Sequence, residues 1–66
     1  MSASRDFIQD AYGDTLKSLF DKLYLAYSDA ATDSTLKQAA EQRFSAGVSL
    51  ALSVRDRAFA LLPPNG

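Results

Sequence analysis

The segment from Phe44 to Leu62 reads FSAGVSLALSVRDRAFALL, and it decides the fold. At about 100° per residue, its apolar side chains cover an arc of about 200° around a helix. A short polar strip remains: Ser45, Ser49, Ser53 and Asp56. A chain of 66 residues buries only a modest share of its surface. We therefore expect so wide an apolar helix to need a second chain.

The limits of this helix follow from its flanks. Two consecutive prolines, which cannot continue a helix, begin the expected tail over residues 63–66. Upstream, residues 28–35 (SDAATDST) are small and polar, which is typical of a turn. Thr35 and Gln38 fit a capping box at the start of the helix. The alternative caps are Thr32, Asp33 and Ser34. We predict a helix over about 34–62.

A second amphipathic pattern fills the first half of the chain. Apolar residues recur there at spacings of three and four: Ile8, Tyr12, Leu16, Leu19, Leu23, Ala26 and Ala30. This spacing predicts a helix over about 4–30. Gly13 leaves two possibilities open, because glycine costs about 1 kcal/mol in a helix interior and also favours helix ends. The helix either continues through Gly13 or is kinked or broken there.

Two long helices joined by a short turn predict an all-α, antiparallel two-helix hairpin that forms a single domain over residues 1–66. A turn centred near residues 31–32 fixes which residues should meet. The expected pairs are Tyr12 with Ala51, Leu16 with Gly47, Leu19 with Phe44, and Leu23 with Ala40. A hairpin alone rarely encloses a core, so we expect a homodimeric four-helix bundle or docking on a partner.

The wide apolar arc of the second helix divides into two flanks. One flank is expected to face the first helix: Gly47, Val54, Ala58 and Leu61. The other is the predicted protein interface: Val48, Leu52, Phe59 and Leu62, with Arg55 set among them. Arg55 should lie level with Asp6 and Asp10. It either pairs at the edge of the core or binds a carboxylate of a partner.

Composition excludes several function classes. The chain has no Cys and no His, which rules out disulfides, thiolate chemistry and His-based triads. With Glu41 its only glutamate, we predict no catalytic, cofactor or metal site. Asp6, Asp10 and Asp14 form either a solvated face or an acidic strip for a basic partner. The net charge of −1 disfavours nucleic acid and anionic membranes, and no apolar run is long enough to span a bilayer.

These features favour a small, non-enzymatic and cytoplasmic protein-interaction module: an adaptor, chaperone-like subunit or inhibitor that acts through an apolar helix face. Its expected partner is a second copy of itself, a larger protein, or both, and no small-molecule substrate is evident. The alternative is a homodimeric helical-bundle regulator that binds RNA or DNA. In that case binding would weaken steeply with salt.

Overall fold

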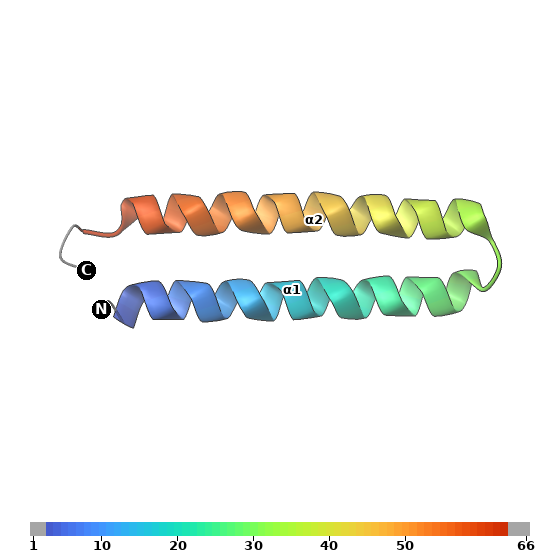
Figure 1. Cartoon of the computed structure of the whole chain (residues 1–66), viewed down its shortest axis with the longest axis horizontal. Coiled ribbons are helices and arrows are strands. Elements are labelled where there is room, and N and C mark those ends of the chain that lie inside the picture. Colours follow the sequence, from blue (N-terminus) through green and yellow to red (C-terminus); the bar gives the residue numbers. More distant parts are fainter. Residues whose placement is uncertain (1–2, 64–66) are drawn as a thin grey trace.

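The computed structural model describes residues 3–63, which form two antiparallel helices lying side by side (Figure 1). Helix α1 spans Ala3–Ala30 and helix α2 spans Ser34–Leu61. The described residues contain no strand. The all-α hairpin expected from the sequence is thus confirmed. The observed bounds lie beside the expected 4–30 and 34–62, and of the expected tail only Pro63 is described, residues 64–66 lying outside the described part.

Helix α1 passes through Gly13 without a break, which decides between the two possibilities left open by the sequence. A Cβ atom added at Gly13 would meet nothing within 4 Å. The glycine is therefore not required there by close packing.

The turn is made by a left-handed residue followed by a capping aspartate. Ala31 has φ of 53°, and its amide donates to the carbonyl of Tyr27 at 3.1 Å. Asp33 then caps α2, because its Oδ1 accepts from the amides of Thr35 at 3.0 Å and Leu36 at 3.2 Å. Among the four caps considered, Asp33 is therefore the one used. This carboxylate satisfies two of the amides that a helix start leaves without partners.

The helices pack closely near their middle, at Gly47. A Cβ there would stand 2.7 Å from Cδ2 of Leu19, so Leu19 occupies the space that the glycine leaves. The expected neighbour of Gly47 was Leu16. The shift arises because helical side chains tilt toward the N-terminus of their helix, so Leu19 covers the turn that precedes it. Nearer the turn, Ala30 and Ala40 are buried between the helices.

The hairpin is thin and elongated. Its Cα atoms extend over 51 × 15 × 10 Å, with a radius of gyration of 15.4 Å against about 11 Å for a compact domain of this length. Its accessible surface is 5099 Å², whereas a compact protein of 7.1 kDa exposes about 4,100 Å². Ala30 and Ala40 are the only buried apolar residues in the described chain. One hairpin therefore leaves most of its large apolar side chains in contact with water.

Candidate functional site: the two faces of the hairpin

A hairpin of two helices has two broad faces, one on each side of the seam where the helices meet. At 100° per residue, each face receives residues from both helices. We call one the groove face, defined by Ile8, Ala11, Thr15, Leu50, Val54 and Leu61. We call the other the stacked face, defined by Phe20, Tyr24, Val48, Leu52 and Phe59.

The groove face carries an apolar groove of about 440 Å³ in the half of the hairpin far from the turn. Leu19 and Gly47, which are in close contact, line its inner end. Leu50 and Val54 stand along the α2 side of the groove and are 66% and 58% exposed, and Leu61 beyond them is 67% exposed. On the α1 side, Ile8, Tyr12 and Leu19 line the groove close to the seam, and the smaller Ala11 and Thr15 form its outer bank. Arg55 lies beside Tyr12 in the same lining. The groove is thus mainly apolar, with large side chains on the α2 bank and small ones on the outer α1 bank.

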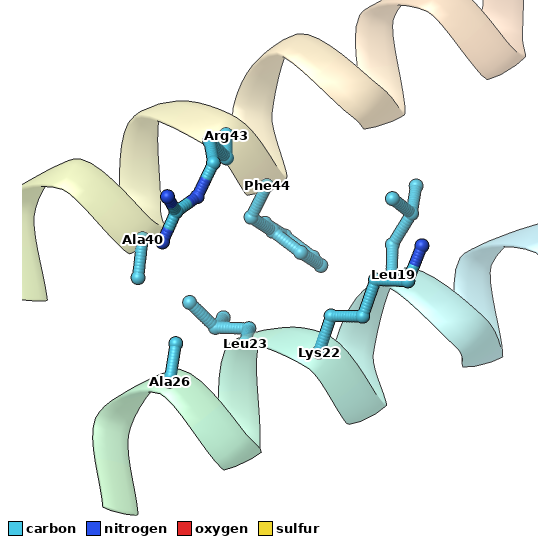
Figure 2. Close-up of a pocket in the computed structure, with 7 residues that line it drawn as sticks. All are labelled: Leu19, Lys22, Leu23, Ala26, Ala40, Arg43 and Phe44. Carbon is cyan, nitrogen blue, oxygen red and sulfur yellow. The ribbon is translucent and has the colours of Figure 1, made fainter. Parts of the chain in front are cut away.

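A second, smaller hollow of about 280 Å³ lies nearer the turn (Figure 2). Phe44 points from α2 toward α1, between Leu23 and Leu19. Lys22 and Arg43 also line this hollow, one from each helix. This hollow therefore has two cations in its lining, whereas the groove farther along has one, Arg55.

On the stacked face, cations and aromatic rings cover the seam. The Arg55 guanidinium lies 4.6 Å from the Tyr12 ring centroid and 5.7 Å from that of Phe59. Arg5 covers Phe59 in the same way, at 4.2 Å. Arg55 also forms an ion pair with Asp56 at 3.0 Å. Such stacking buries the stems and flat faces of the arginines on apolar rings and leaves their charge near water.

Near the turn, Tyr27 extends this cover. Its hydroxyl donates a hydrogen bond to Oε2 of Glu41, and Lys37 lies 5.5 Å from the centroid of its ring. The hydrogen bond to Glu41 raises the pKa of Tyr27 above its usual value of 10.0, with smaller contributions from burial and from the negative charge of Glu41. All three effects favour the protonated phenol. This contact links the two helices through side chains.

The five predicted interface residues lie at or beside the seam and on the stacked face. Leu52 is 39% exposed, and the other four are half-buried: Val48, Arg55, Phe59 and Leu62. Arg55 is paired with Asp56 on its own helix, where the sequence had suggested Asp6 or Asp10. Whether these residues bind a partner stays a prediction.

The division of α2 into a packed and an unpacked flank was wrong for two residues. Val54 and Leu61 were expected to face α1, yet both are exposed on the groove face. The seam passes through the middle of the apolar arc, along Ala40, Gly47 and Ala51, so each flank is left partly uncovered. Leu50, at one edge of the same apolar arc, had been placed in neither flank, and its edge position was the available signal for its exposure.

The described residues form neither a metal-binding cluster nor a membrane-spanning helix. They contain no group of three or more acidic side chains placed to hold a metal. Neither α1 nor α2 is apolar over a stretch long enough to cross a bilayer. What this geometry can do chemically is bury its exposed apolar side chains against another surface.

Comparison with known proteins adds no further assignment: no protein family, curated protein or solved structure matches this chain.

Proposed function

We propose that this protein is a non-enzymatic interaction module that acts by packing its helix faces against other helices, as a homodimeric four-helix bundle, on a larger partner, or both. One observation carries the proposal. The described chain buries two alanines, while nine large apolar residues stay exposed. Exposed apolar surface on this scale marks a protein–protein contact site in a protein that functions in water.

The predicted interface residues supply the surface for a larger partner. Leu52 stands at the centre of the stacked face, with half-buried Val48 and Phe59 one turn or two away on the same helix. Phe20 and Tyr24 of α1 are exposed on the same face. Aromatic residues surrounding an aliphatic anchor, with Arg55 at the edge, have the composition of a protein-binding hot spot.

Composition supports a passive rather than a catalytic role. The chain lacks both His and Cys, the side chains that most often transfer protons or act as nucleophiles near neutral pH. The lack of Cys also agrees with a cytoplasmic location, which belongs to the same proposal. The mode of action would be occupation of a surface, as in an adaptor or inhibitor.

The test compares capture of partners by the wild-type chain and by two variants. Leu52→Asp places a charge in the centre of the stacked face, while Ser53→Asp adds the same charge at an exposed polar position beside it. We expect the wild type and Ser53→Asp to retain the same proteins from an extract of the native cell, and Leu52→Asp to lose them. If nothing is retained and the wild type is also monomeric by light scattering, the interaction module is refuted.

A further inference from the structure

We propose that the groove face is the site where a second copy of this chain docks, with both turns at the same end and α1 of each copy against α2 of the other. This inference rests on the proposed function and specifies one of its partners. It is carried by three independent features of the hairpin: the exposed area, the charges of the two helices, and the sizes of the side chains on the two banks of the groove.

The exposed area matches what a stable dimer needs. Two separate hairpins expose about 10,200 Å² together, whereas a compact particle of twice the mass exposes about 6,800 Å². The difference of about 3,400 Å² lies in the range buried by obligate homodimers. The groove face is the better surface for this burial, because Arg5 and Arg55 already cover the ring of Phe59 on the stacked face. The groove face is hollowed and carries the exposed Leu50 and Val54, with Tyr12 and Arg55 at the floor of the groove.

The charges of the helices favour one orientation. Helix α1 has three basic and five acidic residues, and α2 has four basic and two acidic ones. When the turns lie at the same end, the two-fold axis runs parallel to the helices and each α1 faces the partner's α2, so opposite net charges meet. When the turns lie at opposite ends, each helix faces its own copy, and like net charges meet. Complementary charge selects between such arrangements.

In the same-end dimer each residue keeps its height across the interface. Within one hairpin Tyr12 stacks on Arg55 and Leu19 packs against Gly47, which sets the heights of the two helices. The aspartates of α1 lie on its side away from α2, so the charges act through the net field of each helix and not through close pairs. Lys22 and the partner's Arg43 come to one height and repel, a local cost that the net attraction must exceed.

The side chains of the groove also match in this orientation. The partner's α2 would bring its large residues over the small bank of α1. Leu50 then falls near the height of Thr15, and Val54 near that of Ala11. Large side chains set against small ones are how helices of a bundle interdigitate. Leu50 and Val54 of each copy, which are exposed in a single hairpin, thus pack into the groove face of the other copy.

A matched pair of substitutions tests the face. Leu50→Asp and Leu52→Asp change the same residue type on the same helix, two positions apart and on opposite faces. By sedimentation equilibrium, we expect a dimer for the wild type and for Leu52→Asp, and a dissociation constant raised at least about 100-fold for Leu50→Asp, since a buried unpaired charge costs several kcal/mol. A monomeric wild type, or loss of the dimer in Leu52→Asp alone, overturns the proposal.

A second measurement tests the orientation without disturbing the groove. The chain has no cysteine, so Thr32→Cys in the exposed turn gives one spin label per chain. Turns at the same end place the two labels within about 25 Å, because neighbouring helix axes lie about 8–10 Å apart. Turns at opposite ends place them more than about 40 Å apart, the length of a 28-residue helix. A long distance refutes the orientation even if the chain is dimeric.

Salt supplies the internal control. Raising the ionic strength should weaken dimerisation about three- to tenfold, because it screens the attraction between α1 and the partner's α2. A dissociation constant that falls as salt rises contradicts the charge argument. The dimer and the larger-partner proposals fail separately. A monomer that still loses its captured proteins on Leu52→Asp refutes the dimer alone, and a dimer that captures nothing refutes the larger partner alone.

Discussion

Replacing each described glycine by alanine should have opposite consequences, although both lie inside helices. An alanine stabilises a helix interior by about 1 kcal/mol relative to glycine. At Gly13 the new methyl group meets nothing within 4 Å, so the whole gain should be realised. At Gly47 it would lie 2.7 Å from Cδ2 and 3.2 Å from Cδ1 of Leu19. Leu19 must then leave its position or the helices must separate.

The magnitudes decide the expected order of stability. For a domain of this size, about 1 kcal/mol shifts the melting temperature by about 4–8 °C, which is the gain expected for Gly13→Ala. For Gly47→Ala, overpacking costs about 1–3 kcal/mol and cancels or exceeds the same gain. Thermal unfolding followed by circular dichroism, at one fixed protein concentration, measures both shifts. The concentration must be fixed because dimerisation would itself contribute to the melting temperature.

A double substitution separates crowding from any other effect at Gly47. Leu19→Ala removes the atoms that the new methyl group would meet. Gly47→Ala should therefore stabilise the Leu19→Ala background, in which its cost has disappeared. Equal increases in melting temperature for Gly13→Ala and Gly47→Ala in the wild-type background would show that the helices do not approach closely at Gly47, and would refute the packing described here.

Two further predictions concern the turn and its neighbourhood. Ala31→Gly should raise the melting temperature by several degrees, because the left-handed conformation costs an L-residue about 1–2 kcal/mol and glycine adopts it readily; an unchanged or lower value in thermal unfolding would contradict the φ of this residue. Folding raises the pKa of Tyr27, so its bond to Glu41 should stabilise the fold fully below the unfolded pKa of about 10 and lose that effect as pH rises through the higher folded pKa. In urea unfolding, the stability difference between wild type and Tyr27→Phe should thus be present at pH 8 and shrink above pH 10; a difference that grows with pH would reverse the inferred shift.

The elements of this fold were predictable because their signals are local. Apolar spacings of three and four define each helix, and polar cap-forming residues followed by prolines define the ends of α2. The antiparallel arrangement of the two helices was also predictable, because a short turn between two long helices permits little else. Residue type alone could not identify Asp33 as the cap of α2, because Ser, Thr and Asp are all favourable at the start of a helix.

The faces were harder to predict, for a geometric reason. An apolar arc of about 200° is wider than the strip that one neighbouring helix covers, so the pattern cannot say which part of the arc meets that neighbour. The small residues Ala40, Gly47 and Ala51 marked the seam correctly. Val54 and Leu61 lie about 40° and 60° from the centre of the seam, on the side that two cylinders in contact leave exposed.

The position of the groove along the hairpin has a consequence for how the molecule opens. Each turn of α1 contacts only the turns of α2 that lie opposite it. The hairpin therefore forms most readily from the connecting turn outward. Tyr12 and Arg55 enclose a much longer loop than Tyr27 and Glu41 do, and closing a longer loop costs more entropy. The groove therefore lies on the half of the hairpin where the two helices separate more readily. Amide hydrogen exchange should be slowest near the turn. A partner that fills the groove should also hold the two helices together in the less stable half of the hairpin.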